Sequence, residues 1–299
     1  MHDNRRVRTL LCAASLLCGI GAAIFFSLAL TRTYDSAIQH FTLGTPYLWP
    51  GVAFCFCGLA LSIAGGLLCR RIRTCASDPE NPLAIFAVCC LALDALAVLA
   101  FAIPSIPTMT VLEICRTALL PCAAAFYLIG LFPRLRRGVW HTAFAIAPMG
   151  LALLSAFVVN FDADLPLNAP RKTLTMLAWI AAALFFTTEA RAVLGRFRAA
   201  QFAAYGTLCL TFVTAYTVPA LLLALRGDGS PLEAALLCAV DLLVLVRLLT
   251  FRERADAEAI YEKEKPETDP AEPQPDPTEK EAPDAADETA AADEESDAR

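Results

Sequence analysis

FAAYGTLCLTFVTAYTVPALLLAL, the stretch from Phe202 to Leu225, contains no Asp, Glu, Lys or Arg. A helix of about 20 apolar residues crosses the roughly 30 Å hydrocarbon core of a bilayer, where it satisfies its own backbone hydrogen bonds. The composition of the whole chain agrees, because 57% of its 299 residues are hydrophobic and only 18% are charged. In soluble domains about 45–50% of the residues are apolar and about 25% are charged. We therefore expect an all-α integral membrane protein.

Seven further apolar runs predict an eight-helix transmembrane bundle over residues 10–250. The predicted spans are Leu10–Leu30, Leu48–Leu68, Leu83–Ile103, Thr110–Phe132, Val139–Val159, Thr173–Ala190, Phe202–Leu225 and Leu232–Thr250. Each is long enough to cross the bilayer with a slight tilt. The sixth run is the least clear, since Glu189 and Arg191 interrupt its end.

Arginines gather on alternate loops of this arrangement. One set of loops contains Arg5, Arg6, Arg8, Arg70, Arg71, Arg73, Arg134, Arg136, Arg137, Arg191, Arg196, Arg198, Arg252 and Arg254, whereas the other contains only Arg32, Arg171, Lys172 and Arg226. The positive-inside rule then places both termini in the cytoplasm, with residues 1–9 as an N-terminal cytoplasmic segment. The chain contains no Asn-x-Ser/Thr glycosylation sequon, and a bacterial cell (cytoplasmic) membrane is the simplest location.

The composition changes after the last span. Residues 252–299 contain 18 acidic and 6 basic side chains, within a chain of net charge -6, which gives no support to nucleic-acid binding. Residues 251–265 favour a juxtamembrane helical extension, which Pro266 ends. Residues 266–299 combine Pro, Ala, Asp and Glu and have too little apolar surface to fold, so we expect a disordered acidic cytoplasmic tail. Such a tail either keeps the surface solvated or docks on a basic cytoplasmic protein partner.

Three charged residues lie deep within the predicted spans and form a candidate intramembrane site. At 1.5 Å per residue, Asp94 lies about 16 Å from the inner edge, Asp241 about 14 Å from the outer edge, and Arg116 about 9 Å below the outer edge. We expect Arg116 to reach inward and pair with one aspartate, which leaves the other carboxylate without a countercharge; alternatively it pairs with Glu113 on its own helix face. Such charges either lock helices together or form a functional polar site.

Threonines add a second polar feature, and Glu189 and Arg191 are secondary candidates. Thr207, Thr211, Thr214 and Thr217 recur at helical spacing and share one face of the seventh span. The stripe either packs against a neighbouring helix or lines a polar pathway beside the aspartates. Glu189 and Arg191 are expected at the membrane interface, with Arg191 extending to the headgroups.

Enzyme chemistry has little support. Ten of the twelve cysteines fall inside apolar runs, where a thiol behaves as a small hydrophobic group. The three histidines form no HExxH motif, and neither a Gly-x-Ser-x-Gly elbow nor a P-loop occurs. We expect no catalytic residues, no metal site and no cofactor. The interpretation that we favour is a carrier-like protein that handles a small solute or ion through the midplane polar site. The alternative is a non-transporting scaffold, assembly subunit or sensor whose tail contacts a partner.

Overall fold

The computed structural model describes residues 2–35, 40–41, 45–71, 75–77, 81–136, 138–162, 169–227 and 229–253. The long helices are α1 (His2–Arg32), α2 (Leu48–Leu68), α3 (Pro82–Ala102), α4 (Val111–Leu131), α7 (Ala147–Phe161), α8 (Pro170–Val193), α9 (Ala199–Leu225) and α10 (Pro231–Thr250). Shorter helices are α5 (Pro133–Arg136), α6 (Val139–Phe144), η1 (Cys69–Arg71) and η2 (Ile103–Thr108). Two ladders pair β1 (Tyr34–Asp35) with β2 (His40–Phe41) and β3 (Cys75–Ser77) with β4 (Phe251–Glu253).

Seven helical segments of the described residues are long and apolar enough to cross a membrane. They are Thr9–Arg32, Leu48–Leu68, Pro82–Thr108, Val111–Leu131, Val139–Phe161, Pro170–Val193 and Ala199–Leu225. The expected all-α, multi-pass membrane architecture is thereby confirmed. α10 is not among the seven, because its 20 residues include the charged side chains of Glu233, Asp241 and Arg247.

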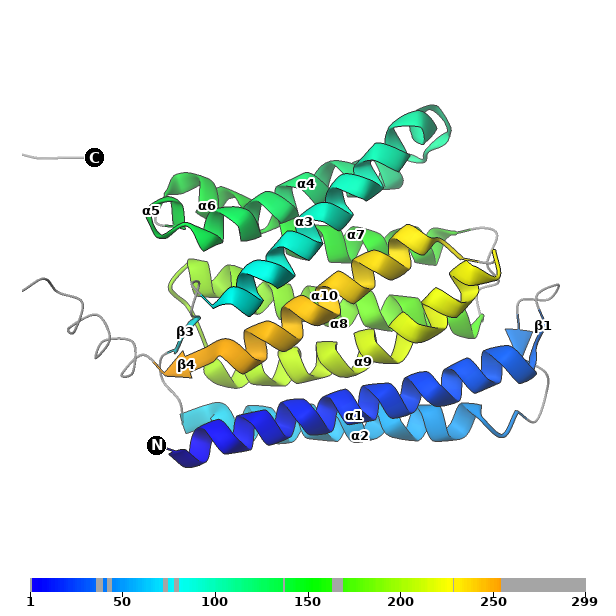
Figure 1. Cartoon of the computed structure of the whole chain (residues 1–299), viewed down its shortest axis with the longest axis horizontal. Helices are drawn as coiled ribbons and strands as arrows, with labels where there is room; N and C mark the ends of the chain where they lie inside the picture. Colours follow the sequence, from blue (N-terminus) through cyan, green and yellow to red (C-terminus); the bar gives the residue numbers. More distant parts are fainter. Residues whose placement is uncertain are drawn as a thin grey trace, which may run out of the picture. The chain divides into compact units, whose positions relative to one another are not determined.

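α9 lies at the centre of the packing. It contacts α1 and α2 on one side and α8 and α10 on the other (Figure 1). α3 packs on α10 and α4, while α7 joins α4 to α8. α8 and α9 are also the most buried of the spans, and Trp179, Phe185 and Leu210 are among the largest fully buried side chains. The polar residues of α9 and α10 are therefore placed in the interior rather than toward lipid.

The fifth predicted span is a single crossing segment but not one continuous helix. α6 ends at Phe144 and α7 begins at Ala147, with Pro148 in the first turn of α7. Proline lacks a backbone N–H and its ring clashes with the carbonyl four residues earlier, so the chain restarts its helix at this point. Pro121 and Pro219 instead lie within the continuous helices α4 and α9.

The two ends of the bundle differ as the arginine pattern predicts. Figure 1 shows the N-terminus, α5 and the β3–β4 ladder at one end, on the left, and β1 at the other. The helices thus run back and forth between the two ends. α1 begins at His2, so the predicted N-terminal segment over residues 1–9 is helical from its second residue.

The predicted helical extension over residues 251–265 is wrong at its start. α10 ends at Thr250, and Phe251–Glu253 forms an antiparallel ladder with Cys75–Ser77. The partner strand is far away in the sequence, so the helix-forming composition of this segment gave no sign of it. The rest of the extension and the predicted tail over residues 266–299 lie outside the described residues.

Candidate functional site

The threonine stripe of α9 is buried, and three of its four hydroxyls are satisfied within their own helix. Thr207, Thr211 and Thr217 each donate to a backbone carbonyl one turn earlier, at 2.8–3.0 Å. A threonine bonded in this way needs no polar surroundings and packs as a small, nearly apolar side chain. These three residues therefore fit a helix-packing surface better than the wall of a polar pathway.

The threonine stripe of α9 packs against glycines of α1 and α2. A Cβ atom at Gly58 would lie 2.7 Å from Thr211 Oγ1, and one at Gly19 would lie 2.7 Å from Thr214 Cβ. No side chain fits at such distances, so the helices approach through their backbones. The Thr211 hydroxyl also lies 3.3 Å from the Ser15 carbonyl of α1, a hydrogen bond between helices. The stripe therefore joins α9 to α1 and α2.

The fourth threonine instead faces the predicted midplane site. Thr214 Oγ1 lies 3.0 and 2.8 Å from the two carboxylate oxygens of Asp241 and donates to them. The Cys238 thiol lies close enough to Asp241 and Asp94 to interact electrostatically with both. α3 and α10, which contain the two aspartates, pack against each other. The structure thus brings Asp94, Asp241 and Thr214 to one region of the bundle.

Arg116 does not join this group. In the described part of the chain, no ion pair links Arg116 to Asp94 or Asp241. Arg116 lies in the second turn of α4, and side chains of a helix lean toward its N-terminus. This tendency favours a position of the guanidinium nearer the start of α4, and the predicted pairing with an aspartate is not formed.

The alternative partner of Arg116 is occupied elsewhere. The Glu113 carboxylate accepts hydrogen bonds from the backbone N–H of Thr110, at 2.7 Å, and from its hydroxyl, at 2.9 Å. Thr110 Oγ1 in turn accepts from the Glu113 backbone N–H, so the two residues form a capping box at the start of α4. Glu113 stabilises the helix end and forms no ion pair with Arg116.

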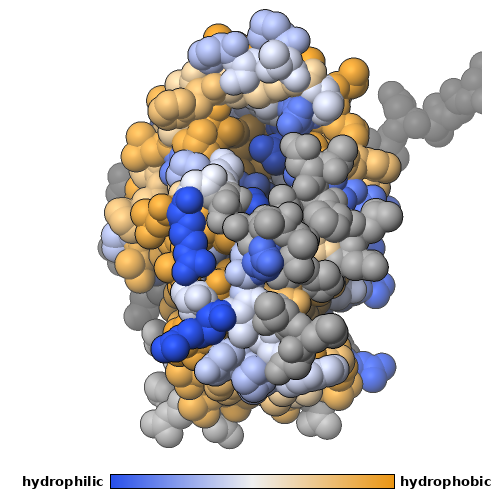
Figure 2. Space-filling view, turned by 90° about the vertical axis from the view of Figure 1, so that its right-hand side faces the viewer, coloured by the Kyte–Doolittle hydropathy of each residue, from blue (hydrophilic) through white to orange (hydrophobic). Residues whose placement is uncertain are grey.

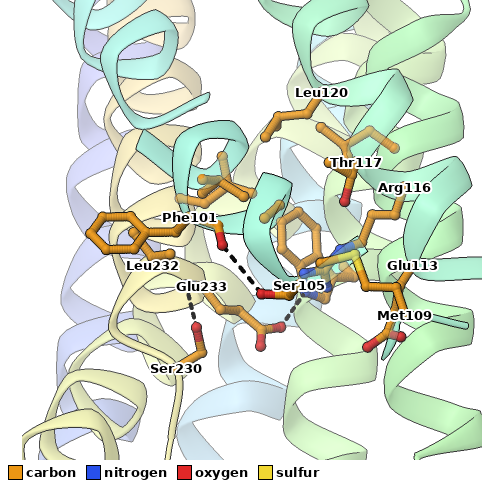
Figure 3. Close-up of a pocket in the computed structure, with 15 residues that line it drawn as sticks. Phe101, Ser105, Met109, Glu113, Arg116, Thr117, Leu120, Ser230, Leu232 and Glu233 are labelled. Atoms are coloured by element: carbon orange, nitrogen blue, oxygen red, sulfur yellow. Dashed lines mark hydrogen bonds between the residues drawn. The ribbon is translucent and has the colours of Figure 1, made fainter. Parts of the chain in front are cut away.

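Arg116 instead lines a cavity of about 210 Å³ between α3, η2, α4, α7, α8 and α10. Figure 3 shows Arg116 and Glu233 extending into this cavity from α4 and α10, with Ser105 between them. Glu233 accepts a hydrogen bond of 3.2 Å from the indole N–H of Trp179, whose side chain is buried. Figure 2 looks onto this end of the bundle, where hydrophilic side chains gather between hydrophobic flanks.

A second group of buried charges lies at the opposite end of α10. Arg247 forms an ion pair of 3.1 Å with Glu189 of α8, and these side chains are only 16% and 9% exposed. The Arg247 guanidinium carbon lies 5.8 Å from the centre of the Tyr127 ring, a cation–π contact. The Glu189 carboxylate, predicted at the membrane interface, is thus paired inside the bundle near the end of α8. Arg191 is exposed and donates to Gln201 at 2.8 Å.

Sequence reasoning missed two residues of these polar groups, Arg247 and Glu233. Both interrupt the apolar run of α10 on the same helix as Asp241, at intervals of six and eight residues. Together with Asp241 they give one span three charges, a signal present in the sequence. The burial cost of each charge would have suggested a partner inside the bundle.

A larger cavity of about 430 Å³ lies between α1, α2, α8 and α9. Its walls include Phe26, Val52, Leu174 and Phe212, and no charged side chain lines it. It therefore adds nothing to the polar site and suits hydrocarbon rather than a polar solute.

Three polar sites thus follow one another along α10. They are the cavity at Glu233, the aspartate region at Asp241 and the ion pair at Arg247. No three His, Cys, Asp or Glu side chains lie close enough together in this part of the chain to hold a metal ion. Neither described cavity is lined by Asp94 or Asp241. Comparison of the chain with protein-family models, with curated proteins and with solved structures gives no match.

Proposed function

We propose that this chain is a carrier-like membrane protein that binds a small polar solute in the cavity between α4 and α10. The observation that carries the proposal is the cavity itself, into which Arg116 and Glu233 extend without pairing with each other. A partly buried charge without a partner is costly, and in membrane proteins such charges typically belong to a substrate or ion site. A solute with complementary groups would compensate that cost.

We further propose that α10 is an eighth crossing helix and that the arginine-rich end of the bundle is cytoplasmic. An even number of spans keeps all the arginine-rich loops on one side, as the positive-inside rule requires. The cavity then opens toward the outside and both termini lie in the cytoplasm. A bacterial cell membrane remains the proposed location.

Asp241 and Asp94 are the proposed coupling groups. Asp241 lies eight residues beyond Glu233 on α10, about 12 Å further into the bundle. A buried carboxylate held by a hydroxyl and without a countercharge can take up a proton or bind a cation. The Glu189–Arg247 pair lies about 9 Å beyond Asp241 and closes the cytoplasmic side. Thr207, Thr211 and Thr217 are proposed to pack the helices only.

Uptake into proteoliposomes tests this function. Purified full-length protein would be reconstituted and supplied with radiolabelled probes of four kinds: acetate, methylammonium, L-alanine and glucose. We expect protein-dependent uptake of at least one probe. Asp241→Asn and Asp94→Asn should abolish that uptake, whereas Thr217→Val, which loses only a bond to its own helix, should preserve it. Uptake equal to that of empty liposomes for every probe would remove the carrier proposal.

A second candidate is a scaffold, assembly subunit or sensor whose acidic tail contacts a cytoplasmic partner. One observation favours it: neither described cavity is lined by Asp94 or Asp241. The test compares proteins co-purified from native membranes with the full chain and with a chain that lacks residues 266–299. An identical set of partners at identical yields would exclude the tail as the contact.

A further inference from the structure

We infer that the cavity between α3, α4 and α10 takes a small zwitterion, a molecule with one ammonium and one carboxylate such as an α-amino acid. This inference rests on the proposed function for the cavity's role and names the class of its solute. Charged groups from α4 and α10 line the cavity.

Glu113, Arg116 and Glu233 are the charges that line the cavity. Arg116 forms no ion pair with a described acidic residue, and the Glu113 carboxylate beside it is held by Thr110. One oxygen of Glu233 accepts from Trp179, which orients the carboxylate at the wall of the cavity (Figure 3). A guanidinium binds a carboxylate through two parallel hydrogen bonds, and a carboxylate binds an ammonium equally well. A molecule with both groups can therefore bridge the two walls.

Opposed charges also disfavour molecules with a single charge. An anion that pairs with Arg116 places its charge in the field of Glu233 and Glu113. A cation that pairs with Glu233 places its charge in the field of Arg116. Each leaves one half-buried protein charge without an ionic partner, which costs more than a missing neutral hydrogen bond. A zwitterion satisfies both charges and adds no net charge to the bundle.

The volume and the remaining walls limit the size of the molecule. A cavity of about 210 Å³ equals the volume of about seven water molecules at about 30 Å³ each. A ligand of about seven to ten non-hydrogen atoms therefore fits, which suits a small amino acid. Phe101, Met109 and Leu120 supply apolar surface for a short aliphatic side chain, and Ser105 and Thr117 supply hydroxyls.

Direct binding to the full-length protein in detergent tests the inference. The probes are L-alanine, L-serine, L-valine and L-leucine, each compared with the carboxylic acid and the amine that lack one of its charges, such as propionate and ethylamine for L-alanine. Isothermal titration calorimetry should show saturable binding of at least one amino acid, with a micromolar to millimolar Kd. Its single-charge analogues should bind about tenfold more weakly or not at all.

Two variants connect that binding to the cavity. Arg116→Gln and Glu233→Gln should each weaken binding of the amino acid about tenfold or more. Arg191→Gln removes an exposed arginine at the other end of the bundle and should leave binding unchanged, as a matched control. Because Arg116 forms no ion pair with a described acidic residue, its replacement should also leave the unfolding temperature unchanged.

The results separate the inference from the proposed function. If no amino acid binds, if propionate or ethylamine binds as tightly, or if both cavity variants bind like wild type, the zwitterion site is refuted. Uptake of acetate, methylammonium or glucose, together with no binding of any of the four amino acids, would refute it while supporting a carrier. Amino-acid binding that depends on Arg116 but gives no uptake would support the site and remove the carrier.

Discussion

Replacing Gly58 by alanine should destabilise the bundle, because α2 meets α9 at this point without room for a methyl group. The new Cβ would contact the Thr211 methyl and lie 2.7 Å from its hydroxyl oxygen, where ordinary contacts begin at 3.4 Å. The helices must therefore separate by at least about 0.7 Å, or Thr211 must leave its rotamer, and such overpacking costs about 1–3 kcal/mol. Alanine also favours a helix over glycine by about 0.5–1 kcal/mol, which offsets part of this cost.

Gly65→Ala in the same helix isolates the packing effect. Gly65 is also buried, but the nearest atom to its added Cβ would lie 3.7 Å away, an ordinary contact. Both variants gain the same helix propensity, so Gly58→Ala should be less stable than Gly65→Ala by the full overpacking cost of about 1–3 kcal/mol. Adding Thr211→Ala to Gly58→Ala removes the two nearest clashing atoms but keeps the Thr211 Cβ at 2.9 Å, so it should restore part of the difference.

Unfolding in mixed micelles with increasing SDS, followed by a thiol-reactive fluorophore, measures these differences. Cys12, Cys55 and Cys209 are buried and become reactive only when the helices separate. Equal stabilities for Gly58→Ala and Gly65→Ala would show that α9 does not approach α2 as closely as described. The interpretation of Thr211 as a packing residue would then be wrong.

Two further predictions use the same unfolding assay. Glu189→Gln should destabilise the protein by about 3–5 kcal/mol, since it leaves Arg247 charged and unpaired, and the added change Arg247→Met should recover part of that loss; a loss below about 1 kcal/mol would mean that Arg247 finds water instead. Thr214→Val should cost about 1.5–3 kcal/mol, because it removes the donor to Asp241, whereas Thr217→Val should cost less than about 1 kcal/mol. Equal effects of the two valine variants would contradict the Thr214–Asp241 hydrogen bond.

The membrane fold was predictable from the sequence because apolar length is a local property. Each of the seven segments that can cross a membrane overlaps a predicted span, and the threonine stripe lies on one face of α9 as its spacing required. The break between α6 and α7 was signalled by Pro148, although the span was predicted as continuous.

Side-chain partners were not predictable, because they depend on how helices rotate and slide against one another. Depth alone suggested that Arg116 would meet Asp94 or Asp241, but depth does not specify the direction in which a side chain leaves its helix. The pairing of Glu189 with Arg247 joins helices that are separated by α9 in the sequence. The β3–β4 ladder likewise joins segments whose composition gives no indication of each other.

That ladder has a mechanical consequence for the two aspartates. β4 directly follows α10, and β3 precedes α3 by a few residues, so the end of one helix is joined to the beginning of the other by backbone hydrogen bonds. If α10 shifts along its axis, α3 is pulled with it at the same end of the protein. Asp241 and Asp94 would then travel together as parts of one unit, and any rearrangement of this bundle would have to occur between that unit and its neighbours.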